Sequence, residues 1–224
     1  MKNVLMVATL AAKDLRIEFR TRQAFLTTLF FALLVLVIFH FAFDPGSPAA
    51  RTASPGILWV ALLFPGIIQL NRSFQIETEE GTIYGILLSP VDRGVFFLGK
   101  CLANWTFLVV IDLVVLVAFV IFYNFSFNVE LLWVALMVVL AGAGFTAVGT
   151  LFAAMVSTLR TREVLLPILL FPIVIPIILA AVNGTQEMLL GTGRFFFKWM
   201  QMLVACDLVF LASGFLTFDY VLGE

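Results

Sequence analysis

Few side chains in this sequence could do chemistry, and the first candidate is a glycine-bounded stretch. Gly94–Cys101 (GVFFLGKC) nearly matches the phosphate-binding pattern G-x-x-x-x-G-K-[ST]. That pattern binds nucleotide through a flexible loop with exposed amides and through a hydroxyl that holds magnesium. Here the four residues between the glycines are bulky and apolar, and Cys101 replaces the hydroxyl residue. We therefore expect no nucleotide site in this chain, and any energy from nucleotide hydrolysis would have to come from a partner.

Two carboxylates stand out because they lie inside long apolar runs. Asp112 and Asp207 are each flanked by aliphatic and aromatic residues, and a lone charge inside a membrane helix costs about 2.5–3.5 kcal/mol on insertion scales. Substrate or proton handling is one hypothesis for these acids. The alternative is a carboxyl that is protonated or hydrogen-bonded across a helix interface. No nucleophile, acid–base pair or metal-ligand spacing accompanies them, and Cys101 and Cys206 form no CxxC motif. We expect neither a catalytic nor a metal site.

The elements that must carry these residues are membrane helices. Apolar residues make up 62% of the 224 residues, charged residues make up 12%, and the mean hydropathy is +1.12. A soluble domain is about half apolar and a quarter charged. About 20 apolar residues in a helix cross a bilayer core, and these runs lack the alternation of barrel strands. We predict an all-α integral membrane protein with six transmembrane helices. The predicted spans are residues 24–43, 55–70, 101–123, 131–155, 164–182 and 199–218.

The basic residues predict how these spans are oriented. Ten of the 13 Lys and Arg residues fall before the first span, between the second and third, or between the fourth and fifth. Cytoplasmic loops carry the excess of positive charge. Both termini and the loop at residues 72–100 are therefore predicted to be cytoplasmic (N-in/C-in), with residues 183–198 on the outer surface.

An amphipathic helix is predicted ahead of the first span, over residues 1–23. Apolar residues recur there at three- and four-residue spacing, with basic residues on an adjoining arc. This pattern is typical of an elbow helix that lies in the headgroup layer, and a simple positive-inside anchor is the alternative. The apolar positions are Leu5, Ala8, Ala12, Leu15 and Phe19.

Three further patterns concern packing. Small residues recur along the fourth span and predict a face for close helix packing within the subunit. Prolines in the fifth span predict a hinge or an unwound segment, although proline is tolerated in membrane helices. Trp59 and Trp199 are candidate interface anchors. The small residues are Gly142, Thr146, Gly149, Ala153 and Ser157, and the prolines are Pro167, Pro172 and Pro176.

The loop at residues 72–100 interrupts the apolar sequence with a short predicted helix and a stop. Three glutamates lie near its start, where acids favour the helix dipole, and Ser89-Pro90 ends it because a residue before proline avoids the helical region. A half-apolar helix exposed to the cytoplasm favours a partner groove, with basic groups near the acids. A helix lying on the membrane is the alternative, which anionic lipid would disfavour. The residues concerned are Glu77, Glu79, Glu80, Ile83, Ile86, Leu87 and Leu88.

This loop resembles the coupling loop of type-2 ATP-binding-cassette (ABC) exporter permeases. The likeness rests on an acid before Gly81-Thr82, two leucines, Ser89-Pro90-Val91, Arg93, and Gly99-Lys100 at the start of a span. Within that group the chain resembles the CcmB family of the cytochrome c maturation system. The matching stretches are the opening KDLRIEFRTRQ, the fifth-span STLRTREVLLPILLFPIVIPIILA and the ending DLVFLASGFLTFDYVLGE. The outer loop after the first span is short, as in that family, and the resemblance covers essentially the whole chain.

The resemblance implies the ABC type-2 exporter permease fold in one domain, residues 1–224, in the bacterial cytoplasmic (inner) membrane. It implies a non-catalytic subunit that forms a homodimer and binds a separate CcmA-like ATPase, which carries the ATP. Further implied partners are a CcmC-like heme-handling protein, a CcmD-like small subunit, a CcmE-like heme chaperone and membrane lipid, but no nucleic acid. Heme is the implied cargo of the complex, and the chain itself binds no cofactor firmly. The implied ATPase-coupling residues are Glu77, Glu79, Glu80, Gly81, Thr82, Ile83, Tyr84, Leu87, Leu88 and Pro90.

Two questions stay open from the sequence. The lone histidine, His40, could ligate heme iron or serve only as a polar anchor at the membrane interface. An ABC permease that exports a lipid, a polysaccharide or a small toxic compound would share the coupling loop. A passive membrane scaffold would have no need for such a loop.

Overall fold

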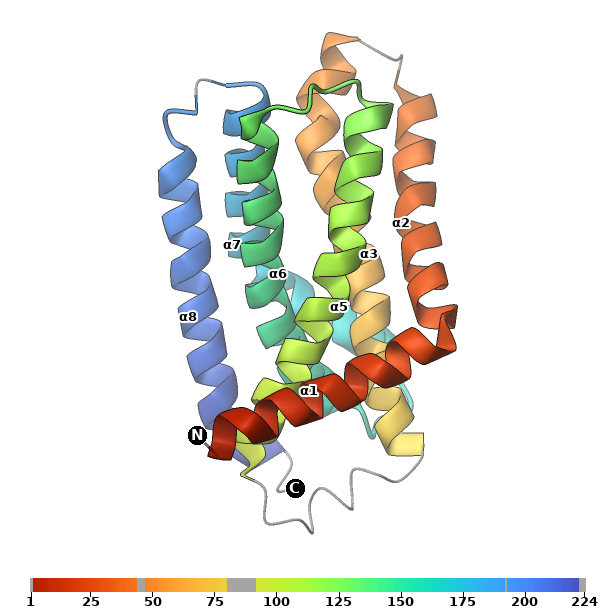
Figure 1. The fold of residues 1–224 in the computed structure, drawn as a ribbon, viewed down its shortest axis with the longest axis vertical. Coiled ribbons are helices and arrows are strands. Elements are labelled where there is room, and N and C mark those ends of the chain that lie inside the picture. Colours follow the sequence, from red (N-terminus) through yellow and green to blue (C-terminus); the bar gives the residue numbers. More distant parts are fainter. Residues whose placement is uncertain (1, 44–46, 80–91, 192, 222–224) are drawn as a thin grey trace.

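The structure is a computed structural model that describes residues 2–43, 47–79, 92–191 and 193–221. The described residues are mostly helical, with no strand among them (Figure 1). The helices are α1 (Lys2–Thr21), α2 (Gln23–Ala42), α3 (Pro48–Glu79), α5 (Arg93–Phe122), α6 (Val129–Val156), α7 (Arg162–Leu189) and α8 (Phe196–Val221).

Six of these helices, α2, α3, α5, α6, α7 and α8, are long and apolar enough to cross a membrane, as the sequence predicted. They stand side by side, whereas α1 lies across their lower ends in Figure 1. Arg22 makes the corner between α1 and α2 with a left-handed backbone (φ 49°). Helix α8 ends at Val221 at the α1 end of the bundle (Figure 1), which fits an even number of crossings.

Several helices extend beyond the predicted spans, because apolar composition marks the lipid-crossing part and not the helix ends. Helix α7 runs without a break through its three prolines, so the predicted unwound segment is wrong. Helix α3 continues to Glu79 and α5 begins at Arg93, so residues 72–79 and 93–100 of the first predicted loop are helical. Helix α7 continues to Leu189 and α8 begins at Phe196, so residues 183–189 and 196–198 of the second predicted loop are helical too. The Asp92 side chain caps α5 by accepting a hydrogen bond from the Gly94 amide at 2.8 Å.

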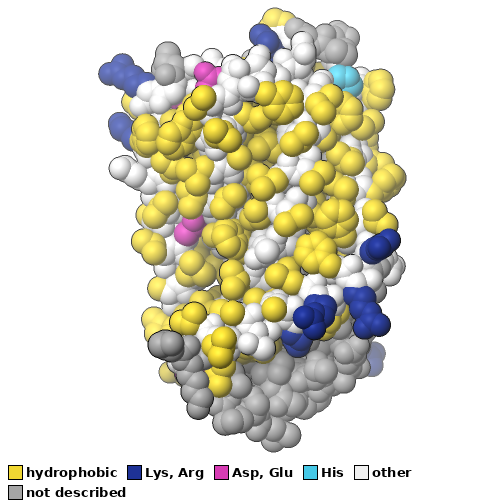
Figure 2. Space-filling view, in the orientation of Figure 1, with side chains coloured by type: hydrophobic (Ala, Val, Ile, Leu, Met, Phe, Trp, Pro, Cys, Tyr) yellow, Lys and Arg dark blue, Asp and Glu magenta, His cyan; other side chains and the backbone are white. Residues whose placement is uncertain are grey.

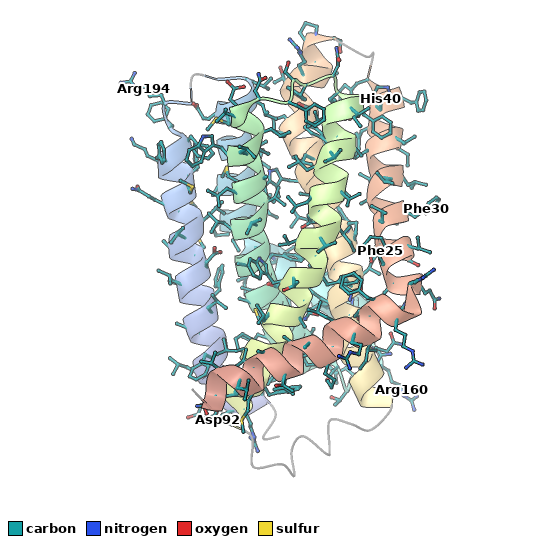
Figure 3. All side chains as sticks on the ribbon, viewed as in Figure 1. Phe25, Phe30, His40, Asp92, Arg160 and Arg194 are labelled. Atoms are coloured by element: carbon teal, nitrogen blue, oxygen red, sulfur yellow. The ribbon has the colours of Figure 1, made fainter. Side chains whose placement is uncertain are left out.

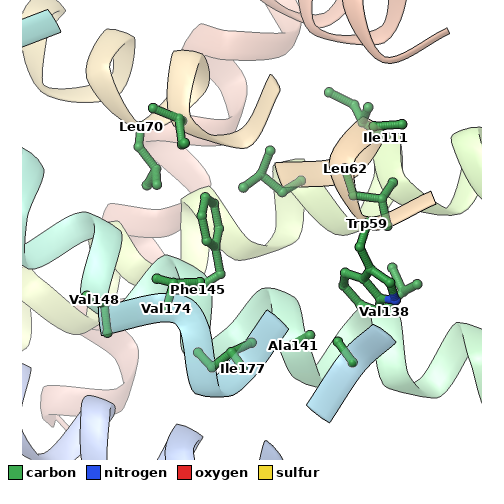
Figure 4. Close-up of a cluster of buried hydrophobic side chains, with 14 of the residues drawn as sticks. Trp59, Leu62, Leu70, Ile111, Val138, Ala141, Phe145, Val148, Val174 and Ile177 are labelled. Atoms are coloured by element: carbon green, nitrogen blue, oxygen red, sulfur yellow. The ribbon is translucent and has the colours of Figure 1, made fainter. Parts of the chain in front are cut away.

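The core of the bundle lies around α6, which packs against α5, α7 and α8. Apolar side chains from α3, α5, α6 and α7 meet there (Figure 4). Trp59 belongs to this core, because it is 4% exposed and its Nε1 donates to Thr185 Oγ1 at 3.0 Å. Its predicted role as an interface anchor is therefore wrong. A partly polar side chain of this size is kept inside by its buried hydrogen bond.

The small residues of α6 form the predicted packing face. Gly142, Thr146, Gly149, Ala153 and Ser157 are all buried. The Leu70 side chain of α3 occupies the place where a Cβ on Gly149 would lie. The absence of a side chain at Gly149 therefore lets Leu70 pack directly on the α6 backbone.

The flanks of the bundle are covered by apolar side chains, whereas the Lys and Arg side chains gather toward its two ends (Figure 2). In the most apolar 18-residue stretch of α2, and in that of α8, only 22% is buried. Phe30, Phe41 and Leu208 are each more than half exposed. In a soluble protein an apolar surface of this extent would be an aggregation hazard. It is the surface expected of a bundle surrounded by lipid.

The face that α1 turns toward the bundle differs from the predicted apolar stripe. Ala11, Asp14 and Glu18 are buried against the bundle, whereas Leu5 is 71% exposed and Phe19 is 41% exposed. Ala8 and Ala12 of the stripe are also exposed, whereas Leu15 packs against the core and the Phe19 ring lies 5.6 Å from the Phe107 ring of α5. Only the first part of the stripe is therefore free of the rest of the chain, and two carboxylates lie on the buried face. The acids point inward because their partners lie on α3 and α5, which the sequence pattern of α1 alone does not reveal.

Candidate functional site

A cluster of buried polar side chains lies where α1 crosses the lower ends of α3 and α5. Lys100 of α5 is only 3% exposed, and its Nζ lies 3.1 Å from Asp14 Oδ2 and 3.2 Å from the backbone oxygen of Ser73. The same ammonium lies 5.3 Å from the centre of the Phe74 ring. A charge removed from water needs such partners, so this ion pair ties three helices together.

A second buried pair lies one turn along α1. Gln69 Nε2 of α3 donates to Glu18 Oε1 at 2.9 Å. Burial removes the Glu18 carboxylate from water and raises its pKa above the ordinary value of 4.5, while the hydrogen bond from Gln69 and the positive charge of Arg72 act in the opposite direction. Among the described residues, Glu18 Oε2 and Arg72 Nε have no hydrogen-bond partner.

The cluster lies on both sides of the loop predicted to couple to an ATPase. Gln69 and Ser73 lie on α3 shortly before the loop, and Lys100 lies on α5 two turns after it. Both sides of the loop are thereby joined to α1. The sequence contained one signal for this arrangement, a pair of acids four residues apart in an otherwise basic segment, Asp14 and Glu18, but that signal names no partner.

The predicted coupling residues themselves lie mostly outside the described residues. Glu77 and Glu79 belong to the last turn of α3. They were expected near the start of a separate short helix, and this expectation is wrong, because the α3 helix continues past its apolar span. The other predicted coupling residues, Glu80, Gly81, Thr82, Ile83, Tyr84, Leu87, Leu88 and Pro90, fall outside the described ranges.

The stretch Gly94–Cys101, which resembles a phosphate loop in sequence, is a helical part of α5. Its backbone amides from Phe96 onward lie within the hydrogen-bonded helix, and its lysine is engaged with Asp14. The sulfur of Cys101 lies 3.8 Å from Thr146 Oγ1 in a buried contact. The segment therefore packs α5 against α1 and α6.

The two membrane-embedded acids lie on different helices and are not joined by any described contact. Asp112 is 8% exposed on α5, and Asp207 is 6% exposed on α8. Asp207 faces Gly144 of α6 so closely that a Cβ there would meet its Oδ1. That oxygen has no side-chain hydrogen-bond partner among the described residues.

Another buried polar contact joins α5 to α6. Asn104 donates to Thr150 Oγ1 at 3.2 Å.

A cavity of about 670 Å³ opens between α3 and α7 next to the polar cluster. Arg72, Glu163, Phe64 and Phe171 are among the side chains that line it, and the two phenylalanine rings lie 5.7 Å apart. Its volume is typical of a small-molecule site. Arg72 therefore faces both the Glu18 carboxylate and this cavity.

His40 lies at the opposite end of the bundle, near the end of α2 (Figure 3). Figure 3 places Asp92 and Arg160 toward the α1 end and His40 and Arg194 toward the other. The structure thus distributes the candidate residues over three levels: the polar cluster at one end, the two acids within the bundle, and the histidine at the far end. In the described part of the chain no group of three or more His, Cys, Asp or Glu residues is placed to hold a metal ion.

Comparisons with known proteins give one family. The family model described as CcmB protein matches residues 5–219. A relative named Heme exporter protein B from Pseudomonas aeruginosa is 29% identical over 194 residues, which covers 85% of this chain and 84% of the relative. Its namesake from Bradyrhizobium diazoefficiens is 27% identical over 211 residues, covering 93% of each. The one from Haemophilus influenzae is 28% identical over 172 residues, covering 75% of this chain and 76% of the relative.

Proposed function

The chain belongs to the CcmB family, and we propose that it is the membrane subunit of an ATP-driven complex that serves heme export in c-type cytochrome biogenesis. The observation that carries this proposal is the family match over residues 5–219, together with relatives named Heme exporter protein B. Six helices able to cross a membrane fit a multi-pass membrane subunit. The chain would move or release cargo while a partner hydrolyses ATP, and would not itself be a catalyst.

The proposed location is the bacterial inner membrane, with the α1 end in the cytoplasm. Helix α1 with its basic residues lies at this end (Figure 1), Arg93 begins α5 next to Asp92, and Figure 3 places Asp92 and Arg160 there too. Positive charge favours the cytoplasmic side. The exposed stripe of α1, including Leu5 and Phe19, would lie in the headgroup layer as an elbow helix. The ABC type-2 exporter fold is part of the same proposal.

The proposed route of energy runs through residues 80–91. This segment would dock on a CcmA-like ATPase, with Ile83 and Leu87 in an apolar groove and the nearby glutamates at its basic rim. Because Asp14 holds Lys100, and Glu18 holds Gln69, a displacement of the segment would move the ends of α3 and α5 together with α1. The polar cluster would thus keep the two sides of the loop in a fixed relation during the ATPase cycle.

The proposed complex contains further subunits. A second copy of the chain would complete the membrane part, beside a CcmC-like heme-handling protein, a CcmD-like small subunit and a CcmE-like heme chaperone. Heme would be the cargo of the complex, and ATP would bind only to the ATPase. Native mass spectrometry of the complex extracted in mild detergent would count each subunit directly.

The proposal is tested by co-purification and by gene deletion in the source organism. We expect the tagged chain to recover a CcmA-like ATPase, and its deletion to abolish heme-stained c-type cytochromes while total heme stays unchanged. Restoration by the wild-type gene is the control. Normal c-type cytochromes in the deletion strain, with a change in lipid or polysaccharide export instead, would favour the alternative ABC permease function.

A further inference from the structure

A concave site lies at the end of the bundle opposite α1, where three helix ends meet. A cavity of about 340 Å³ is formed there by the end of α2, the start of α3 and the end of α5. Its lining combines one imidazole, aromatic rings and one guanidinium. The residues that line it are His40, Phe43, Ala50, Arg51, Phe122, Tyr123 and Asn124.

His40 is held in this cavity by aromatic rings. The centre of its ring lies 5.7 Å from that of Phe122 and 6.0 Å from that of Tyr123, which meets it edge-on. Tyr123 is itself stacked on Phe119 at 5.0 Å. In the described part of the chain the contacts of the imidazole are with rings and not with hydrogen-bonding groups. Its nitrogens are therefore available to a ligand.

The Tyr123 hydroxyl is a second unsatisfied group at this site. Its oxygen is buried and has no hydrogen-bond partner among the described residues. A buried hydroxyl without a partner costs free energy, so the phenol would gain from a polar ligand group. Tyr123 lies at the end of α5, and the next residue, Asn124, turns the chain with a left-handed backbone (φ 53°).

Arg51 connects this cavity to a second one. It lines a neighbouring cavity of about 300 Å³, as does Asn124, and the rest of that wall is mainly polar. The two cavities therefore share an arginine and an asparagine, with an aromatic side next to His40 and a polar side beyond. Glu130 also lines the polar cavity, so a negatively charged ligand group would be favoured near Arg51 and disfavoured farther along that wall.

We propose that the two cavities form a binding site for an iron porphyrin, with His40 as a ligand to the iron and Arg51 pairing with a porphyrin carboxylate. The assignment rests on the proposed function in heme export. A neutral imidazole is a common axial ligand of heme iron, and an arginine binds a carboxylate through paired hydrogen bonds. The aromatic side chains of Phe43 and Phe122, which line the cavity, suit an aromatic macrocycle. A lipid phosphate would pair with the guanidinium, but it would not bind through an imidazole surrounded by aromatic rings.

The test is titration of the purified full-length chain, carrying a histidine-free affinity tag, with ferric heme in detergent. Wild type should show a saturable shift of the Soret band and the electron paramagnetic resonance signature of an axial imidazole. His40→Asn keeps a polar group at the interface but removes the ligand, so this signature should disappear. The affinity for ferric heme should fall at least about tenfold, because loss of a residue that only supports a metal ligand already costs about that much. Arg51→Gln should weaken binding several-fold and keep the imidazole signature.

Arg194→Gln is the matched control, because Arg194 lies at the same end of the bundle but away from His40 (Figure 3). It should leave heme binding unchanged. Metal-free protoporphyrin separates the two roles, because its binding should depend on Arg51 and not on His40. Displacement of heme by phosphatidylglycerol micelles at low concentration would point to a lipid headgroup and would overturn the assignment.

Two other results would also contradict the proposal: an imidazole signature that persists in His40→Asn, or equal weakening by Arg51→Gln and Arg194→Gln. Thermal unfolding of each variant shows whether it is folded. Recovery of the ATPase is read separately, and His40→Asn should leave it at the wild-type level. If the wild-type chain recovers no ATPase, the proposed function is contradicted. If the wild-type chain recovers the ATPase but shows no axial-imidazole signature with heme, only this site is contradicted.

Discussion

The Nζ atom of Lys100 lies 3.1 Å from Oδ2 of Asp14, and both side chains are almost fully buried. This contact joins α5 to α1 just beyond the predicted coupling loop. Ser73 adds its backbone oxygen from α3, so one ammonium group holds three helices. An ion pair in this position is costly to break from one side only, because the remaining charge stays buried without its partner.

The first prediction concerns this ion pair. Lys100→Met should destabilise the chain by about 3 kcal/mol, because it leaves Asp14 buried without its partner. This is the low end of the expected cost, since Asp14 keeps its contact with Lys13. Adding Asp14→Leu should restore much of the loss, since no lone buried charge then remains. Lys13→Met is the control: that lysine is 45% exposed and should contribute under about 1 kcal/mol. Thermal unfolding in detergent measures all four proteins, and equal effects of the two lysine variants would contradict the model.

The second prediction concerns pH. The folded state raises the Glu18 pKa above 4.5, chiefly through burial. Between 4.5 and the raised value, the folded protein therefore binds more protons than the unfolded chain, and stability falls as the pH rises through this window. Glu18→Gln keeps the oxygen that accepts the Gln69 amide and removes the charge. It should melt above wild type at alkaline pH, and the difference should shrink as the pH approaches 4.5. A variant that is less stable than wild type at alkaline pH would disprove this account.

The third prediction concerns the contact between α6 and α8. A Cβ on Gly144 would collide with Asp207 and lie 2.8 Å from Ile177 Cδ1. Gly144→Ala should therefore cost about 1–3 kcal/mol, as overpacking does in cores. Gly56→Ala is the control, because a Cβ there meets no atom within 4 Å and alanine favours the helix by about 1 kcal/mol. Unfolding temperatures of the two variants should change in opposite directions or differ clearly in size.

The fourth prediction concerns orientation. Ten of the 13 basic residues lie on one side of the predicted topology, which places the α1 end in the cytoplasm. In a background without Cys101 and Cys206, Glu79→Cys should resist a membrane-impermeant thiol reagent in intact cells, and Pro48→Cys should react. Both should react after the membrane is opened. The reverse pattern in intact cells would invert the topology.

The fifth prediction concerns the docking of residues 80–91 on the ATPase. Leu87→Ala or Ile83→Asp should reduce ATPase co-purification more than a change of any single glutamate. Apolar anchors contribute about 2 kcal/mol or more at interfaces, whereas an exposed charge contributes under about 1 kcal/mol. Replacing Glu77, Glu79 and Glu80 together should slow association and reduce its salt dependence. If Ile83→Asp leaves both ATPase recovery and c-type cytochromes unchanged, this loop is not the coupling element.

The sequence by itself determined the membrane class, the six spans and the small-residue face of α6. These are local properties. A run of about 20 apolar residues has the length of a bilayer core whatever surrounds it, and small residues at regular spacing allow close packing wherever the helix lies. The family resemblance was likewise readable in continuous stretches, and the family model confirmed it over residues 5–219.

Only the tertiary structure decided which polar residues meet. Asp14 pairs with Lys100, Trp59 pairs with Thr185, and Arg51 and His40 line one cavity. Each of these arrangements arises from packing between different helices. The structure also corrected the α1 face, the unbroken α7 and the end of α3 at Glu79. Hydrophobic periodicity is set by the solvent around a single helix, whereas a buried charge is stable only next to its partner. The position of that partner depends on how the helices pack, which no single segment encodes.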